Sequence, residues 1–173
     1  MTAALLILGA LPFAVGRIQD WYMSANLNSS LPYGVISLAF LSAWGLLAFL
    51  MNGNGQRTKQ IVIFLNLIAA FDLVLIGIQI LVLHSYWSNG IGIWTQLFYL
   101  PMLNLGFCLT GWSHGVFPAY AASFILMVGV TFAGCKLREK RNEIRGDRAA
   151  VRSVFVRFII RITKYIEIQS FLI

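Results

Sequence analysis

The sequence predicts an all-α integral membrane protein with four transmembrane helices, and three observations lead to this class. Hydrophobic residues make up 59% of the 173 residues and charged residues only 11%, whereas a soluble domain carries about 25% charged residues. The apolar residues gather into runs of about 20, the length that crosses a bilayer as a helix. Ten of the thirteen Lys and Arg residues lie between Lys136 and Lys164. The chain therefore divides into an apolar bundle, residues 1–135, and a basic tail, residues 136–173.

Four apolar segments are the predicted spans, at about residues 2–23, 34–51, 61–83 and 116–135. The first lacks the basic residues that open a signal peptide, so we expect a retained helix that continues past Arg17. A short polar turn joins the second and third segments and predicts a tight helical hairpin. The last segment enters through Pro118 and ends at Gly134 and the basic run. These spans leave little room for a separate soluble domain.

Residues 84–115 contain no Lys, Arg, Asp or Glu and make the span count uncertain. Residues 91–112 are long enough to cross, which would give five spans. However, Pro101, Gly106 and several polar residues interrupt this stretch. We expect a helix-break-helix segment that lies in the outer interface or dips partway in, because irregular backbone must be covered by protein at membrane depth.

Basic residues also help to choose the topology, since they gather on the cytoplasmic side of membrane proteins. Four spans with the N-terminus inside place twelve of the thirteen basic residues in the cytoplasm, including Arg57 and Lys59. Five spans force the N-terminus outside and place eleven inside, Arg17 among them. The counts differ little, so the polar composition of residues 84–115 favours four. We expect a multi-pass protein of the cell membrane with both termini in the cytoplasm.

Aromatic residues are frequent in the two predicted outer loops, where an amphipathic ring suits the headgroup level. An aromatic belt explains them, and a pocket for an amphiphilic ligand or for a partner's helix is the sharper alternative. The candidate pocket residues are His84, Trp87, Trp94, Tyr99, Trp112 and His114. Two histidines without a carboxylate or thiolate neighbour make a poor ligand set, so no metal or cofactor is expected.

Asp72 lies in the middle of the third predicted span, where a charged carboxylate costs about 2.5 to 3.5 kcal/mol on insertion scales. Gln79 follows seven residues later on the same helical face. Arg17 is the expected partner of Asp72, and Asp20 on the same helix competes for it. Three interpretations remain open: a buried Arg–Asp network that fixes packing, a proton or cation relay, and a protonated Asp72 that donates a hydrogen bond.

The basic tail carries a stripe of arginines at helical spacing, and Gly146 and Asp147 are expected to separate it from a second helix over about residues 148–169. That helix has one broad apolar face and a basic face, the pattern of a helix lying on the cytoplasmic membrane surface. Docking to a protein partner and an end without a role are the alternatives. Anionic headgroups are the expected partner, in preference to nucleic acid. The candidate surface-binding residues are Arg141, Arg145, Arg148, Arg152, Arg157, Arg161 and Lys164.

Catalysis is not indicated, because the sequence contains no nucleophile elbow, zinc-protease or P-loop motif. We expect a non-enzymatic accessory, regulatory or immunity-type subunit that acts through protein or lipid contacts. Channel formation by oligomerisation also remains open, since Gly129 and Ala133 form a small-xxx-small pair. Transport through Asp72 is the first alternative. A membrane enzyme or redox protein acting on a lipid or quinone at the outer face is the second. Cys108 and Cys135 fall on opposite membrane sides and are not expected to bridge.

Overall fold

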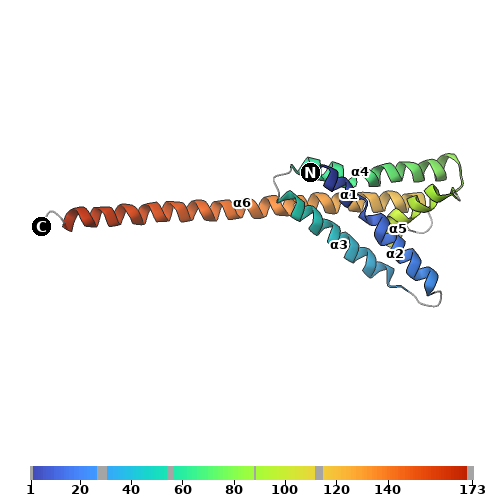
Figure 1. The fold of residues 1–173 in the computed structure, drawn as a ribbon, viewed down its shortest axis with the longest axis horizontal. Helices are drawn as coiled ribbons and strands as arrows, with labels where there is room; N and C mark the ends of the chain where they lie inside the picture. The colour runs from blue at the N-terminus through green and yellow to red at the C-terminus, as the bar shows by residue number, and fades with distance from the viewer. Residues whose placement is uncertain (1, 27–30, 54–56, 88, 112–114, 171–173) are drawn as a thin grey trace. The chain divides into compact units, whose positions relative to one another are not determined.

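The computed structural model describes residues 2–26, 31–53, 57–87, 89–111 and 115–170, and it is helical with no strand among them (Figure 1). Side chains are described up to residue 144. The elements are α1 Thr2–Gly9, α2 Leu11–Ala25, α3 Tyr33–Asn52, α4 Thr58–Gly77, the π-helix η1 Ile78–Val82, α5 Gly90–Thr110 and α6 Phe117–Ser170. The chain forms two compact units, the bundle unit Met1–Lys136 and the tail unit Leu137–Ile173.

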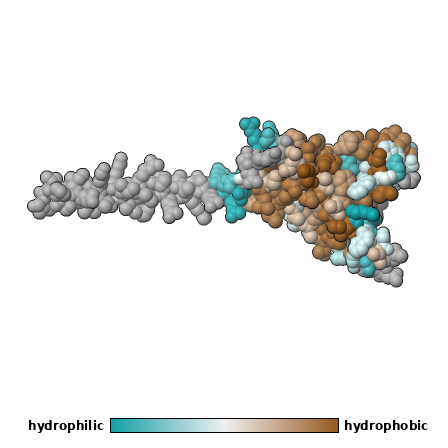
Figure 2. Space-filling view, viewed as in Figure 1, coloured by the Kyte–Doolittle hydropathy of each residue, from teal (hydrophilic) through white to brown (hydrophobic). Residues whose placement is uncertain are grey.

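The described residues contain five helices long and apolar enough to cross a membrane: Ala3–Ala25, Tyr33–Asn52, Thr58–Val82, Gly90–Thr110 and Phe117–Ile144. The all-helical membrane class is thereby supported. Apolar side chains cover most of the visible face of the bundle unit (Figure 2). Ile125 is 68% exposed and Phe71 67% exposed. Surfaces of this kind are stable against lipid and costly against water.

The first predicted helix bends at Ala10, where α1 ends and α2 begins. Pro12 explains the bend, because it has no N–H to bond the carbonyl group of Leu8 and its ring clashes with that carbonyl. The two halves contact different neighbours. Gly9 approaches the backbone of Leu65 in α4, while Gly16 meets the backbone of Leu97 in α5.

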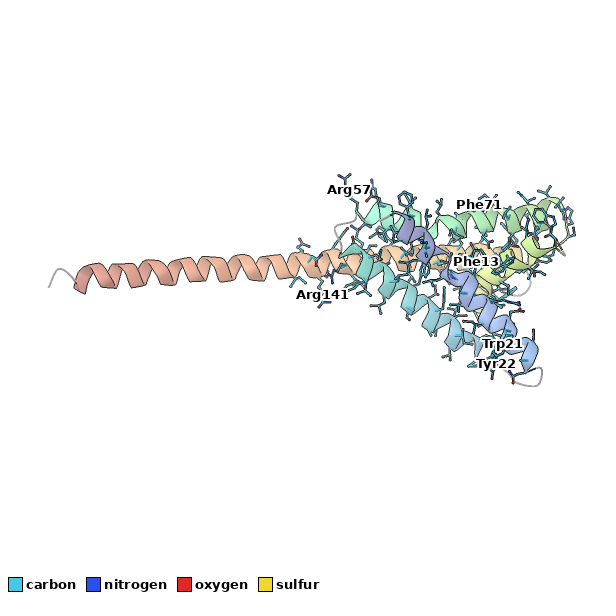
Figure 3. The ribbon with its side chains drawn as sticks, in the orientation of Figure 1. Phe13, Trp21, Tyr22, Arg57, Phe71 and Arg141 are labelled. Atoms are coloured by element: carbon cyan, nitrogen blue, oxygen red, sulfur yellow. The ribbon has the colours of Figure 1, made fainter. Side chains whose placement is uncertain are left out.

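Two sets of contacts define the ends of the bundle unit. At the Cys135 end, the Asn52 side chain donates hydrogen bonds to the Cys135 carbonyl (2.8 Å) and to the Thr58 hydroxyl (3.4 Å). At the Phe117 end, Gly77 packs against the Phe117 ring. The end of α3, the start of α4 and the last apolar residues of α6 therefore lie together at the Cys135 end. The end of α4 and the start of α6 lie together at the Phe117 end. Arg57 lies near the Cys135 end, whereas Trp21 and Tyr22 lie at the far end of α2 (Figure 3).

The helix α5 is continuous from Gly90 to Thr110, so the expected break in residues 84–115 is wrong. Pro101 lies inside it, and its missing N–H frees the carbonyl group of Leu97, four residues earlier. Gly16 packs directly on that carbonyl, close enough that a Cβ atom would overlap it. A Cα–H group at such a contact is a weak donor. The neighbouring helix therefore covers the backbone group that proline leaves open.

Both halves of α5 are attached to the Phe117 end of the other helices. Near its start, Thr95 accepts a hydrogen bond of 3.2 Å from Gln79 in η1. Near its finish, Gly106 packs on Ala119, close to the start of α6. The helix therefore starts and finishes at the same end of the bundle unit.

In the tail unit, α6 continues to Ser170 without the interruption expected at Gly146 and Asp147. A single glycine costs a helix about 1 kcal/mol, which favourable flanking residues such as Arg, Glu and Ala can offset. Arg141 is exposed. The side chains of the other predicted surface-binding residues lie outside the described ones: Arg145, Arg148, Arg152, Arg157, Arg161 and Lys164.

Candidate functional site

Asp72 is buried in the middle of the bundle unit, with only 3% of its surface exposed. Its Oδ2 atom has no hydrogen-bond partner. Tyr99 of α5 and Tyr120 of α6 lie within electrostatic range of the carboxyl group. Their rings pack edge to face with centroids 5.6 Å apart. The carboxyl group therefore sits between α4, α5 and α6, beside two phenol rings.

Arg17 does not pair with Asp72, so that part of the predicted network is wrong. Its Nη1 atom forms an ion pair of 2.9 Å with Asp20, one helical turn along α2. The helix α5 explains the separation, because it touches α2 through Leu97 and α4 through Tyr99. It thus lies between the helices that carry Arg17 and Asp72.

Gln79 is fully buried, and its amide group joins η1 to α5. It donates to the Thr95 hydroxyl at 3.2 Å and accepts from the Trp87 backbone N–H at 3.2 Å. The π-helical turn directs this side chain inward, since its wider spacing shifts the face that the helix presents. These two hydrogen bonds of Gln79 attach α5 and the residues just before it, and neither involves Asp72.

Further polar contacts connect α6 to α4 and to α5. Asn66 donates a hydrogen bond of 3.2 Å to the Thr131 hydroxyl. Ser123 donates to the Ala119 carbonyl at 2.8 Å and lies 3.4 Å from the Met102 carbonyl of α5. Hydrogen bonds between membrane helices contribute about 0.6 kcal/mol each on average. Their combined effect is to fix which faces of the helices meet.

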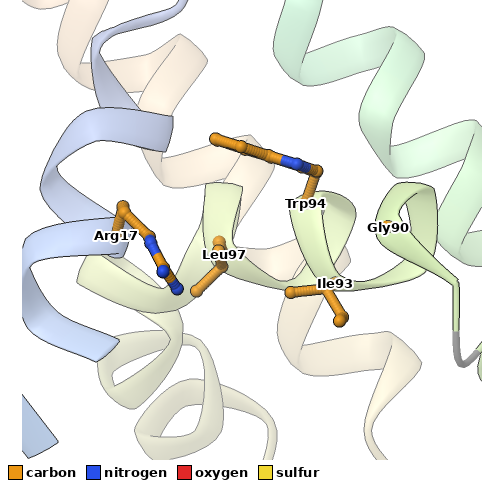
Figure 4. A pocket seen from close by; sticks show the side chains of 5 residues that line it. All are labelled: Arg17, Gly90, Ile93, Trp94 and Leu97. Atoms are coloured by element: carbon orange, nitrogen blue, oxygen red, sulfur yellow. The ribbon is translucent and has the colours of Figure 1, made fainter. Parts of the chain in front are cut away.

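A pocket of about 210 Å³ opens between α2 and α5, lined by Arg17, Gly90, Ile93, Trp94 and Leu97 (Figure 4). The Arg17 side chain extends from α2 toward α5 in this view. The Phe13 ring of α2 packs edge to face on Trp94 and Phe98, with centroid distances of 5.8 and 4.8 Å. The pocket thus combines one cation with aromatic and aliphatic walls.

The predicted outer-pocket residues separate in the structure. Trp94 lines the pocket, Tyr99 is buried in the core, and Trp87 is half-buried. His84 is exposed, with a positive φ of 50°. Trp112 and His114 lie outside the described residues. Among the residues that the structure describes, no group of three His, Cys, Asp or Glu side chains is placed to hold a metal ion.

The surroundings of Tyr86, in the loop before α5, connect it to α6. Partial burial raises the pKa of Tyr86 above its ordinary value of 10.0, while a hydrogen bond with Tyr120 opposes that rise. Tyr86 therefore links the exposed loop to the buried Tyr120 of α6.

Sequence reasoning missed Gly90, Ile93 and Leu97, which line the pocket, and Gly16 and Phe13, which pack against α5 beside it. The available signal was the pair of Gly16 in an apolar helix and Pro101 in another, which mark a close backbone approach and a freed carbonyl group. Neither residue indicates which residue it packs against, so the crossing of α2 and α5 could not be predicted from the sequence. Comparison with family models, curated proteins and solved structures finds no match to this chain.

Proposed function

We propose that the chain crosses the membrane four times and that α5 lies across the outer end of the bundle unit, dipping partway into the outer leaflet, with both of its ends on the same side of the membrane. Support comes from the contact of Gly77 with Phe117, which brings the end of the third span beside the start of the last. An intervening helix that crossed once would separate them by the thickness of the bilayer, about 30 Å. The burial of α5 against its neighbours supports the same topology, since backbone irregularity at depth requires protein cover.

Both termini are cytoplasmic in this proposal. Arg57 and Lys59 flank the start of α4 at the Cys135 end, and Lys136 follows Cys135 directly. Basic residues of this kind remain on the cytoplasmic side during insertion. The arginine-rich tail then lies next to the anionic inner leaflet, where each basic residue contributes about 1 kcal/mol to surface binding.

The proposed function is that of a non-enzymatic membrane subunit, accessory, regulatory or immunity-type, which acts through protein and lipid contacts. One observation carries it: the space beneath α5 is filled. Phe98, Tyr99 and Met102 have no exposed surface, and Asp72 is 3% exposed. Such packing supports a scaffold, because a permeation pathway needs room for water or an ion beside its carboxylate.

Purification of the full chain from its native membrane in mild detergent tests this function. The expected result is a stoichiometric membrane-protein partner that is lost when residues 137–173 are removed or when outward apolar residues of α5 away from the pocket, such as Leu109, are made polar. Asp72→Asn should retain the partner. A chain that purifies alone under all conditions would contradict the proposal.

Proton or cation transport is the second candidate, favoured by the unpartnered Oδ2 atom of Asp72. Reconstitution of the purified chain into vesicles with an internal pH-sensitive dye provides the test. Transport predicts flux that Asp72→Asn abolishes while the unfolding midpoint stays unchanged. A packing role predicts no flux and a changed midpoint. Asp20→Asn, on the exposed side of α2, is the matched control.

A further inference from the structure

The pocket between α2 and α5 follows from how closely these helices cross. Gly16 and Leu97 meet backbone to backbone, so the two helices are in contact at that level. Further along, α2 presents Arg17 and α5 presents Ile93 and Trp94 across an open space. Gly90 adds no side chain, and a Cβ atom there would contact nothing within 4 Å. The cleft is thus wedge-shaped, closed at the crossing and open away from it.

Arg17 is the charged residue that lines this pocket, and its ion-pair partner Asp20 lies beside it on α2. The guanidinium group of Arg17 is 2.9 Å from the Asp20 carboxylate, and the two side chains are 60% and 36% exposed. Residues three apart on a helix have Cβ atoms about 5–6 Å apart. Both charges are therefore open to a ligand that carries the opposite pair at a similar separation.

The apolar wall suits a hydrocarbon chain. Ile93 is 50% exposed and Trp94 is 51% exposed, on the side of α5 that borders the pocket. Trp21 and Tyr22, one turn beyond Arg17, are the kind of residue that marks the headgroup level. A ligand with a charged end beside Arg17 and an apolar chain along Ile93 would match both walls.

We propose that this pocket binds a zwitterionic phospholipid with a primary-amine headgroup. Its phosphate accepts hydrogen bonds from the Arg17 guanidinium group, a geometry that arginine favours. Its ammonium group donates to the Asp20 carboxylate, and an acyl chain lies on Ile93 and Trp94. Asp20 determines the class, because it would repel a headgroup that carries only negative charge. The inference deepens the lipid contact of the proposed function and rests on it.

Vesicle binding tests the proposal with the purified full chain. The chain is reconstituted in phosphatidylcholine with a minor fraction of phosphatidylethanolamine or phosphatidylglycerol carrying brominated acyl chains. Tryptophan quenching by the brominated lipid is measured, and the contribution of Trp94 is the difference from Trp94→Phe. The expected result is stronger quenching by phosphatidylethanolamine than by phosphatidylglycerol or by brominated phosphatidylcholine.

Two charge variants distinguish recognition from a general lipid shell. Arg17→Gln should weaken the preference for phosphatidylethanolamine by about tenfold, the effect of one lost charge-assisted contact. Asp20→Asn should reverse the preference toward phosphatidylglycerol. Arg57→Gln, at the opposite end of the bundle unit, should change nothing. Thermal unfolding in detergent confirms that each variant is folded.

Equal quenching by all three lipids, or a wild-type preference for phosphatidylglycerol, would overturn the proposal. So would a preference that survives both Arg17→Gln and Asp20→Asn. A wild-type chain that purifies without any partner protein, with its lipid preference intact, would instead count against the proposed subunit function. The two failures are therefore distinguishable.

Discussion

The hydroxyl group of Tyr99 donates a hydrogen bond of 2.7 Å to the backbone carbonyl oxygen of Ala69, and both residues are fully buried. Ala69 lies near the middle of α4, eight residues before its end at Gly77. Both ends of α5 contact residues at the Phe117 end of the bundle unit. The bond from Tyr99 to Ala69 therefore shows how far the central part of α5 extends toward the middle of α4. Tyr99 is the point that holds α5 inside the bundle unit.

Tyr99→Phe removes that hydrogen bond and leaves the ring in place. We expect the free energy of unfolding to fall by about 0.6 kcal/mol and by no more than about 1.7 kcal/mol, the range measured for bonds between membrane helices. Denaturant titration in mixed micelles measures it. Tyr22→Phe, at an exposed position, is the control. An unchanged value for Tyr99→Phe would mean that ring packing alone holds α5.

A close approach of α3 and α6 depends on two glycines. A Cβ atom on Gly134 would lie 3.2 Å from the carbonyl carbon of Gly45 and 3.3 Å from the Cβ atom of Ala48, and would overlap the Gly45 carbonyl oxygen. Gly134→Ala should therefore separate the helices and lower the free energy of unfolding by about 1–3 kcal/mol.

Gly129→Ala is the matched control for that substitution on the same helix. A Cβ atom at Gly129 meets nothing within 4 Å, and the position is exposed. The variant should leave stability unchanged or raise it by up to about 1 kcal/mol through helix propensity. If Gly129→Ala is the more damaging change, the outward face of α6 packs against another chain, as expected for a small-xxx-small contact.

Much of the bundle could be predicted from the sequence, because apolar runs bounded by polar residues specify helix positions directly. Residues 34–51, 61–83 and 116–135 fall within or close to α3, α4 with η1, and α6. The continuity of α5 could not be predicted, since Pro101 breaks a helix unless something covers the carbonyl group it frees. That cover is Gly16, a residue 85 positions earlier.

The candidate site was less predictable for a similar reason. Depth counted along straight helices brings Arg17 near Asp72, but α5 lies between the helices that carry them. The local alternative, Asp20 at 2.9 Å, was visible from helical spacing. Ion pairs between neighbours on one helix could be inferred from the sequence. Pairs between helices could not, because they depend on which helix lies in the centre of the bundle unit.

Asn52, the last residue of α3, joins α3 to α6 through its 2.8 Å hydrogen bond to the Cys135 carbonyl. Asn52→Ala should lower the free energy of unfolding by about 1 kcal/mol, because the bond is buried and spans two helices. Asn142→Ala, at an exposed position of α6, should change it by less than about 0.5 kcal/mol. Equal effects in the same micelle titration would contradict a joining role for Asn52.

Cysteine labelling tests the proposed topology. Lys59 and Ser85 are both exposed, Lys59 at the start of α4 and Ser85 in the loop before α5. Each is replaced by cysteine in a Cys108→Ser background, in which the remaining Cys135 is buried. With four spans, a membrane-impermeant maleimide should label Ser85→Cys in intact cells and Lys59→Cys only after permeabilisation. The parent Cys108→Ser chain should stay unlabelled until it is denatured. Five spans with an external N-terminus predict the opposite order, because Lys59 would then be external and Ser85 cytoplasmic.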